Sequence, residues 1–396
     1  MAEMDPIVIV GAARTPMGGF QGDLAPAAAP ELGATAIRAA FEGAGLAPEA
    51  VDEVVMGCVL PAGQGQAPGR QAALGAGLPL GAPCTTLNKM CGSGMKAAMV
   101  AMDQLRAGEG RVVVAGGMES MSNAPYLSLK MRGGARIGHA QMFDHMFLDG
   151  LEDAYDKGRL MGTFAEDCAE AFQFTREQQD SYAIASLERA QRAQETGGFG
   201  AEIAPVTLRT RKGDVAVETD EQPRNARPDK IPHLKPAFRE GGTVTPANSS
   251  SISDGAAALA LMRRSDAEAE GRPIRAVLRA HASHAQAPAQ FPTAPIPAMR
   301  KALEKTGWSV ADVELWEINE AFAVVPMAAM RELGLPHDVV NVRGGACALG
   351  HPIGASGARI LVTLLHAMEA QDARRGVASL CIGGGEGTAV TVERVG

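Results

Sequence analysis

The chain has 396 residues, of which 46% are hydrophobic and 4% aromatic, and its formal net charge is −8 at pH 7. A chain of this length can bury a large core, and it is expected to divide into two or three domains. The mildly acidic balance, without a Lys/Arg-rich run, excludes a nucleic-acid partner. No apolar stretch approaches the roughly 20 residues of a membrane-spanning helix, so a soluble protein without a membrane partner is expected.

The first residues, MAEMDPIVIVGAARTP, carry acids where a signal peptide would carry bases, and their apolar run is only strand-length. A cytoplasmic location is therefore expected. The cysteines are widely spaced, with no C-x-x-C pair and no neighbouring histidine cluster, so neither a metal site nor a disulfide framework is indicated. Free thiols are expected at Cys58, Cys84, Cys91, Cys168, Cys347 and Cys381.

Short β-branched runs alternate along the chain with Ala-rich segments of helical period, which is typical of an α/β protein with buried strands. The many Ala, Gly and Met residues favour helices packed closely on a sheet or on each other. In chain order, the segments are a strand at 7–10, helices at 34–43 and 95–107, a strand at 111–114, a helix at 358–370 and a strand at 388–392.

The sequence contains an internal repeat, since residues 36–60 align without a gap on residues 298–322. Both copies have the pattern of an amphipathic helix, a Gly stop, a short element and a buried strand. Each is followed by a Gly-rich segment that opens a helix and then by a strand ending in Gly-Gly-x-Glu. The fold is therefore predicted to be a duplication.

A stretch of different character interrupts the first copy and carries most of the long charged helices. We predict an inserted loop or lid domain here, which is suited to form a ligand wall. The predicted division is residues 1–121 with 252–272 for the first half, 122–251 for the insertion and 273–396 for the second half.

The segment NKMCGSGMKAA places Cys91 just before a glycine-rich turn and a helix. Unpaired backbone N–H groups and the positive end of the helix dipole can stabilise a thiolate there, which makes Cys91 a candidate nucleophile. A buried thiol at a helix start is the alternative for the segment taken alone.

Three further segments carry groups suited to the same chemistry. GGACALGHPIGASGAR places His351 between glycines that permit close approach of a ligand, and makes it the best candidate base. In CIGGGEG, Cys381 ends a strand and is followed by glycine N–H groups suited to an oxyanion. NEAFA offers the side-chain amide of Asn319 at the end of its own strand.

Together these segments, with GTVTPANSSSISDGAA, resemble in order and spacing the signature blocks of the thiolase family over essentially the whole chain. The resemblance implies a five-layered αβαβα fold and a homotetramer built as a dimer of dimers. It implies an acyl-CoA C-acyltransferase that uses acyl-CoA and CoA, with no metal and no other cofactor. An acetyl-CoA acetyltransferase of fatty acid metabolism is the expected member.

The resemblance also implies roles for individual residues. Cys91 is similar to the acyl-accepting nucleophile, His351 to its base and Cys381 to the acid/base that moves the substrate α-proton. Asn319, holding a water with His351, resembles the first oxyanion hole, and the N–H groups of Cys91 and Gly383 resemble the second. For CoA, Ser250 resembles the serine beside pantetheine. The remaining substrate contacts implied are Leu151, Met161, Phe238, Pro246, Phe291, Ala321 and Phe322. Arg224 lies in a basic loop of the insertion and is either a contact to the adenine or a phosphate of CoA or an ordinary solvated residue.

Some positions depart from the common family pattern and leave the acyl-chain preference open. Glu386 stands where Gln or Met is common, and Leu160 stands where many short-chain members have His. Phe291 and Pro292 resemble a pair found in thiolases that accept 2-methyl-branched substrates. Against that, Pro223 replaces the tyrosine of potassium-binding, branched-chain members. A longer-chain or 2-methyl-branched 3-ketoacyl-CoA thiolase is thus the alternative to short-chain specificity.

Three other interpretations are weaker, two from other classes of protein and one from within the condensing enzymes. The segment APCTTLN resembles the catalytic segment of NAD-dependent cysteine dehydrogenases, but Leu87 breaks that motif and the N-terminal glycines lack the dinucleotide pattern. A non-catalytic acyl-CoA-binding protein would not need Cys91, His351 and Cys381 together. A ketoacyl synthase would share the fold but normally has histidine in place of Cys381.

Overall fold

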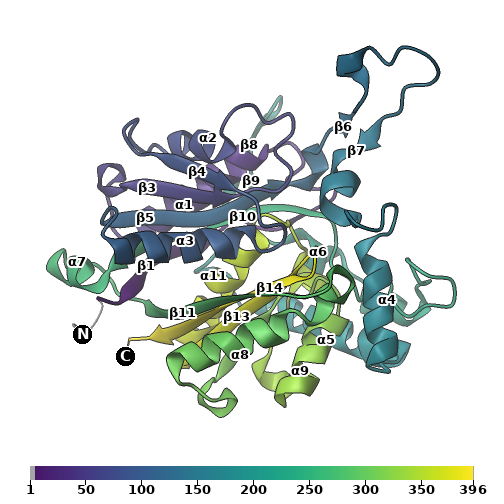
Figure 1. Cartoon of the computed structure of the whole chain (residues 1–396). Helices are drawn as coiled ribbons and strands as arrows, with labels where there is room; N and C mark the ends of the chain where they lie inside the picture. Colours follow the sequence, from purple (N-terminus) through teal and green to yellow (C-terminus); the bar gives the residue numbers. More distant parts are fainter. Residues whose placement is uncertain (1–4, 396) are drawn as a thin grey trace.

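The computed structural model describes residues 5–395, and within this range ten strands form one continuous sheet (Figure 1). The strand order is β12-β13-β14-β11-β1-β10-β5-β3-β4, and β2 pairs with β10. In that order the strands span Leu315–Ile318, Arg375–Ile382, Glu386–Arg394, Ala276–Ala285, Ile7–Arg14, Ser253–Arg263, Val112–Ser120, Glu53–Gly57 and Cys84–Leu87, with β2 at Gly18–Gly19.

The sheet consists of two halves that meet at one short contact. Ile7–Ile9 of β1 pair antiparallel with Ala276–Leu278 of β11, and this pairing joins the β1-β10-β5-β3-β4 half to the β11-β14-β13-β12 half. The residue run Ile7–Val10 is fully buried, with Ile7 and Ile9 facing one core and Val8 and Val10 facing another. A strand buried on both faces explains why its sequence is continuously apolar.

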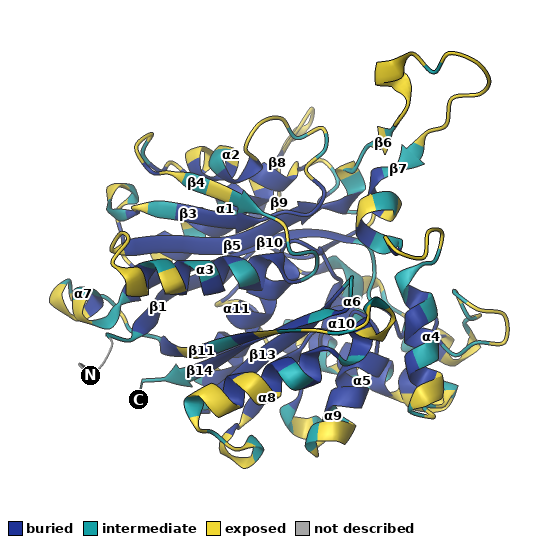
Figure 2. Ribbon diagram, in the orientation of Figure 1, coloured by how far each residue is buried: buried dark blue, intermediate teal, exposed yellow. Residues whose placement is uncertain are grey.

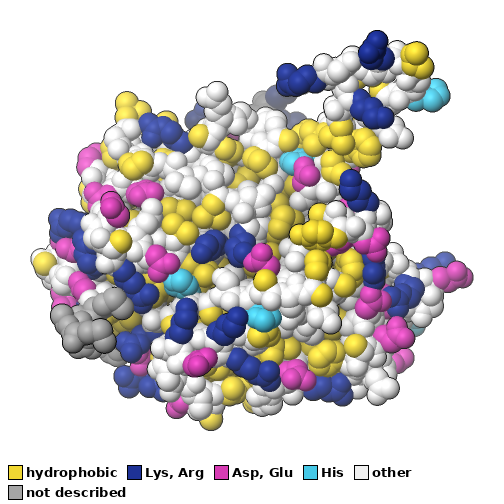
Figure 3. Space-filling view, in the orientation of Figure 1, with side chains coloured by type: hydrophobic (Ala, Val, Ile, Leu, Met, Phe, Trp, Pro, Cys, Tyr) yellow, Lys and Arg dark blue, Asp and Glu magenta, His cyan; other side chains and the backbone are white. Residues whose placement is uncertain are grey.

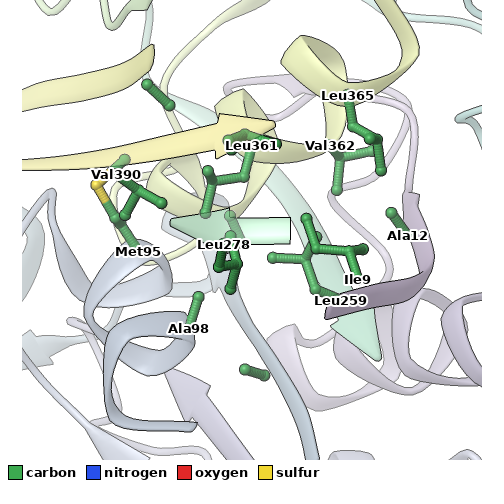
Figure 4. Close-up of a cluster of buried hydrophobic side chains, with 14 of the residues drawn as sticks. Ile9, Ala12, Met95, Ala98, Leu259, Leu278, Leu361, Val362, Leu365 and Val390 are labelled. Carbon is green, nitrogen blue, oxygen red and sulfur yellow. The ribbon is translucent and has the colours of Figure 1, made fainter. Parts of the chain in front are cut away.

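Helices fill three further layers around the two sheet halves. Helices α3 (Ser93–Ala107) and α11 (Ser356–Ala370) lie between them, where they share a core with both halves (Figure 4). Helices α1 (Ala29–Gly43) and α2 (Pro68–Gly75) cover the outer face of the first half, and α8 (Pro295–Thr306) and α9 (Val324–Leu333) that of the second. The predicted αβαβα architecture is confirmed.

The two central helices touch backbone to backbone, which requires glycine at the crossing. A Cβ on Gly94 would lie 2.7 Å from the backbone nitrogen of Ala358, and a Cβ on Gly357 would lie 2.4 Å from that of Met95. Both distances are far below van der Waals contact, so a larger residue would push the helices apart. Since the segments of Cys91 and His351 precede these two helices, the crossing also sets how closely they approach.

The predicted duplication is visible in the topology. Strands β3 and β5 pair in parallel in the first half, as β12 and β13 do in the second. Helix α3 precedes β5 as α11 precedes β13, and α1 precedes β3 as α8 precedes β12. The two halves therefore present their strand ends and helix starts to a common junction.

The stretch 122–251 packs against both halves as a collection of short elements and two longer helices. Its longer helices are α4 (Met161–Ala171) and α5 (Arg176–Glu195). The shorter elements are β6 (Tyr126–Leu127), a 3₁₀ turn (Met131–Gly133), β7 (Phe143–Asp144), a π-helical turn (Phe147–Leu151), β8 (Val206–Thr210), β9 (Gly213–Val217), α6 (Glu221–Asn225) and a second 3₁₀ turn (Pro228–His233). Two short α-helices outside this stretch are α7 (Arg264–Ala269) and α10 (Ala346–Leu349).

One part of this stretch, the hairpin arm of residues 126–144, projects away from the rest of the molecule (Figure 1). Most of its residues are exposed, in contrast to the buried sheet (Figure 2). Ile137 is 98% exposed and Met142 68%. Figure 3 shows hydrophobic side chains gathered at the base of the arm and basic ones toward its tip.

Candidate active site

A cavity of about 360 Å³ lies where loops of both halves meet the insertion. It brings together most of the residues that the sequence predicts for the site: Cys91, Leu151, Met161, Phe238, Pro246, Ser250, Phe291, Ala321, Phe322, His351 and Gly383. Cys91, His351 and Gly383 come from three separate loops of the duplicated halves, whereas the insertion supplies much of the opposite wall. The pocket is predominantly apolar, which suits an acyl-pantetheine chain.

A tight turn before α3 holds Cys91 in place. Asn88 Oδ1 accepts a 2.9 Å hydrogen bond from the Met90 N–H, and Ser93 Oγ accepts one of 2.8 Å from the Lys89 N–H. Met90 has a φ of +47°, in the left-handed region that non-glycine residues rarely adopt. Such local strain persists only when surrounding contacts enforce it, so the position of Cys91 is strongly determined.

The Cys91 thiol is not a standing thiolate. Burial raises its pKa to about 11, although the backbone N–H groups of Gly383 and of Cys91 itself point at the sulfur and oppose this shift. The N–H groups act on the thiol in the direction that the helix start predicts, but desolvation outweighs them. Cys91 rests as a thiol, and a base must take its proton when it attacks.

His351 is placed to be that base, because its hydrogen bonds define its tautomer. Ser356 Oγ lies 2.9 Å from the Pro352 carbonyl, to which it donates its only hydrogen, and 2.5 Å from His351 Nδ1. Nδ1 must then carry the proton and donate to Ser356, which leaves the lone pair on Nε2. Burial lowers the pKa of His351 to about 3, with Arg359 acting in the same direction, so the ring is neutral and its Nε2 lone pair is free.

Asn319 faces the same ring nitrogen. Its Nδ2 lies 3.5 Å from His351 Nε2, and its Oδ1 has no hydrogen-bond partner among the described residues. Asn319 is 1% exposed and does not itself line the cavity. The structure thus places the Asn319 amide beside the His351 ring.

Glu320, which sequence reasoning does not single out, anchors this segment. Its carboxylate accepts hydrogen bonds from Tyr182 Oη at 2.9 Å and Ser186 Oγ at 2.7 Å, both on α5 of the insertion. The Cys347 N–H, four residues before His351, also donates to it at 3.0 Å. One buried carboxylate therefore ties together the insertion, the Asn319 segment and the His351 loop. Its position within NEAFA is the signal that could have indicated this.

Cys381 lies behind the cavity rather than on its wall. It is fully buried at the end of β13, inside an apolar cluster that includes Phe291 and Phe322. Burial raises the pKa of its thiol well above the ordinary value, and the neighbouring Cys91 raises it further. The two cysteines are thus close to each other, with Gly383 forming the surface of the pocket beside them.

The remaining predicted contacts divide into those at the cavity and one elsewhere. Ser250 Oγ donates to the Ala321 carbonyl at 3.0 Å. Phe238 and Phe291 both make edge contacts with Phe322 and form an aromatic end to the pocket. Arg224 is exposed, pairs with Asp23 at 2.6 Å and does not line the cavity.

Comparisons with known proteins agree with this geometry. Residues 7–265 match the family model "Thiolase, N-terminal domain" and residues 272–394 match "Thiolase, C-terminal domain". The chain is similar to an acetyl-CoA acetyltransferase of Pseudomonas aeruginosa, at 51% identity over 99% of this chain and 100% of the relative. One from Cupriavidus necator is 50% identical over the same shares. The crystal structure of the Bacillus anthracis acetyl-CoA acetyltransferase matches with a TM-score of 0.97 and 39% identity, covering both chains completely.

The chain belongs to the thiolase family. The resemblance predicted from the sequence is confirmed, together with the family fold. The dehydrogenase alternative loses its basis, because Cys84 lies on the edge strand β4 and is not among the residues around the thiolase pocket.

Several residues of the thiolase pocket are not found by sequence reasoning. Met121 and Ile353 line the pocket together with Cys91, and Phe147 extends the wall within the insertion. Ile353 lies inside the same glycine-rich block as His351, so the sequence could have indicated that it lies at the pocket. Phe147 belongs to an isolated π-helical turn for which the sequence pattern gives no comparable indication.

Within residues 5–395, no three His, Cys, Asp or Glu side chains come together as a set that could hold a metal ion. In the same range, every helix is too short or too polar to cross a bilayer.

Proposed function

We propose that this thiolase is an acetyl-CoA C-acetyltransferase, which joins two acetyl-CoA molecules into acetoacetyl-CoA and CoA or runs the reverse cleavage. The observation that carries the proposal is the convergence of Cys91, His351 and Gly383 at one apolar pocket. Relatives at about half identity over their full length carry the name acetyl-CoA acetyltransferase. The reaction needs neither a metal nor a redox cofactor, because acyl transfer moves no electrons between oxidation states.

The first half-reaction transfers an acetyl group to Cys91. The thiol of Cys91 gives its proton to His351 Nε2 while its sulfur attacks the thioester carbonyl, and the proton then passes to the departing CoA sulfur. The N–H groups of Cys91 and Gly383 stabilise the carbonyl oxygen as it becomes negative. Each such donor typically contributes about 3–4 kcal/mol to the transition state.

The second half-reaction makes the carbon–carbon bond. Cys381 acts in its thiolate form, which its raised pKa makes a strong base, and removes a methyl proton from a second acetyl-CoA. The resulting enolate oxygen is held by Asn319 and His351 through a shared water. The carbanion attacks the acetyl group on Cys91, the Cys91 sulfur leaves as a thiolate, and it takes the proton that Cys381 has gained, which returns Cys381 to its thiolate form. Because Cys381 has no exposed surface, this step is shielded from bulk solvent.

The acyl end of the pocket favours short substrates. Phe291, which is 3% exposed, closes it with edge contacts to Phe164 and Phe322. A longer or 2-methyl-branched 3-ketoacyl-CoA is the alternative substrate, for which the Phe291–Pro292 pair is the supporting observation.

Rates of CoA-dependent cleavage across 3-ketoacyl-CoA substrates test the proposal. We expect acetoacetyl-CoA to be cleaved fastest and 3-ketooctanoyl-CoA at least about tenfold more slowly, since each methylene without room costs binding energy. In Phe291→Ala, which opens the aromatic end, the longer substrate should gain relative to acetoacetyl-CoA. Faster cleavage of the longer or 2-methyl compound by the unmodified enzyme would favour the alternative. Cleavage of none of them would contradict the proposed function.

We further propose that the enzyme is a cytoplasmic homotetramer, a dimer of dimers, acting in fatty acid metabolism. The arm of residues 126–144 supports the tetramer, because Leu129, Met131 and Ile137 are each more than half exposed. Exposed apolar side chains on a projecting arm suit contact with another copy of the chain.

Shortening the arm should lower the oligomeric state. Leu127 and Phe143 are paired in the β6–β7 hairpin, so an Asn-Gly turn in place of residues 128–142 can close it without disturbing the body. We expect light scattering to report a tetramer for the full chain and a dimer for the shortened one. A full-length chain that is monomeric, or a shortened chain that stays tetrameric, would contradict the role of the arm.

A further inference from the structure

An ion pair connects the Cys91 loop of one half to the Gly383 loop of the other. Lys89 Nζ contacts Glu386 Oε2, with the two side chains 23% and 36% exposed. Lys89 lies two residues before Cys91, and Glu386 begins β14 three residues after Gly383. Neither side chain lines the cavity, so the pair touches the loops that carry the reacting groups and not the substrate.

Glu119 is the residue that matches Glu386 in the internal repeat, and it connects the first half to the His351 loop of the second half. Glu119 ends the Gly-Gly-x-Glu segment of the first half, as Glu386 does in the second. Its carboxylate accepts a 2.9 Å hydrogen bond from the Gly354 N–H, in the loop that carries His351. It also accepts bonds from the Val59 and Leu60 N–H groups at 2.9 and 3.1 Å. In each half, the glutamate of the Gly-Gly-x-Glu segment therefore contacts the catalytic loop of the other half.

The two connections differ in burial. Glu119 is fully buried, whereas Glu386 is reached by solvent. A partly exposed ion pair contributes little to overall stability, because solvent screens it and two long side chains must be ordered. A small energetic contribution can still fix the distance between two loops.

We infer that Lys89 and Glu386 are positioning residues that set how the Gly383 N–H is aimed at the Cys91 sulfur. The inference rests on the proposed acyl transfer at Cys91. The N–H group of Gly383 is one of two that point at this sulfur, and its donor strength depends steeply on distance and angle. An oxyanion donor displaced by an ångström loses much of its effect on the transition state.

Steady-state kinetics of acetoacetyl-CoA cleavage in Glu386→Gln and Lys89→Met test the inference. We expect kcat to fall about 3-fold to 5-fold in either variant, the effect of an ion pair worth up to about 1 kcal/mol, with KM for acetoacetyl-CoA unchanged because the pocket wall is intact. The exchanged pair, Lys89→Glu with Glu386→Lys, should recover a large part of the lost kcat, since it restores the ion pair with its polarity reversed.

A matched control is available elsewhere in the fold. Arg275 and Glu369 form an ion pair of 2.6 Å with similar exposures, 19% and 33%, and neither residue lines the cavity. Glu369→Gln should therefore leave kcat unchanged. Thermal unfolding of Glu386→Gln and Glu369→Gln should shift by similar small amounts, which separates positioning from general stability.

The acetyl adduct separates failure of this inference from failure of the proposed function. Mass spectrometry of the unmodified enzyme after incubation with acetyl-CoA should show acetyl on Cys91. If that adduct forms but Glu386→Gln retains full kcat, or the exchanged pair recovers nothing, the positioning role is wrong and the acyl transfer stands. If no adduct forms, the proposed function is wrong and the inference falls with it.

Discussion

Replacing Cys91 with serine should abolish acyl-enzyme formation and leave the fold intact. A thiol gives up its proton to a neighbouring base far more readily than an alcohol does, so serine cannot replace Cys91 as the nucleophile. The substitution exchanges one atom in a position fixed by the turn before α3, so little packing is lost. Mass spectrometry after incubation with acetyl-CoA should show a single acetyl group in the unmodified enzyme and none in Cys91→Ser.

The matched control is Cys84→Ser, because Cys84 is another partly buried thiol but lies on the edge strand β4. It should acetylate normally and keep full activity. An acetyl adduct on a cysteine other than Cys91 in the unmodified enzyme would overturn the assignment. Loss of activity in Cys84→Ser would instead revive the reading in which APCTTLN is the catalytic segment.

The raised pKa of the Cys91 thiol predicts how its alkylation rate depends on pH. A standing thiolate would react with iodoacetamide at a rate that levels off near neutral pH. With the pKa raised to about 11, the alkylation of Cys91 should keep rising with pH up to that region. Peptide-resolved mass spectrometry distinguishes Cys91 from the other thiols.

The fold is well predicted where local pattern and global packing agree. The Ile7–Val10 run is buried on both faces, and a helix that lies between two sheet halves must be rich in small residues, as α3 and α11 are. The alignment of 36–60 on 298–322 predicts the symmetry because each copy must bury the same face. These properties depend on spacing along the chain, which the sequence records directly.

The site is predicted less completely, because part of it depends on distances between remote segments. The pairing of Arg224 with Asp23 joins positions 201 residues apart, and nothing in the composition of either loop indicates it. The pKa of Cys91 is a second case, since a helix start suggests a thiolate until the burial of the sulfur is known. The Lys89–Glu386 pair is a third, although the repeat of Gly-Gly-x-Glu marks both glutamates. The order and spacing of motifs along the sequence indicate the reacting residues, whereas only the folded structure shows which residues surround them.

Replacing Cys381 with serine should separate the two half-reactions. Acetylation of Cys91 forms no carbanion, so Cys381→Ser should still take an acetyl group from acetyl-CoA. Condensation should fall by about 10²–10⁴-fold, the usual contribution of a general acid or base, since a serine hydroxyl is a poor base near pH 7. The fully buried position of Cys381, beside Cys91 but off the pocket wall, means that this substitution leaves substrate contacts largely unchanged.

Two measurements distinguish a proton shuttle from a structural thiol at this position. Exchange of the acetyl methyl protons of acetyl-CoA with deuterated water should occur in the unmodified enzyme and disappear in Cys381→Ser. Cys168→Ser is the matched control, because Cys168 is buried in the same apolar cluster and receives the same added polarity. It should retain both exchange and condensation. If Cys381→Ser instead loses acetylation and condensation in equal measure, Cys381 takes part in activating Cys91. The division of labour between the two thiols would then be wrong, and the closeness that raises the pKa of Cys381 would be part of nucleophile activation.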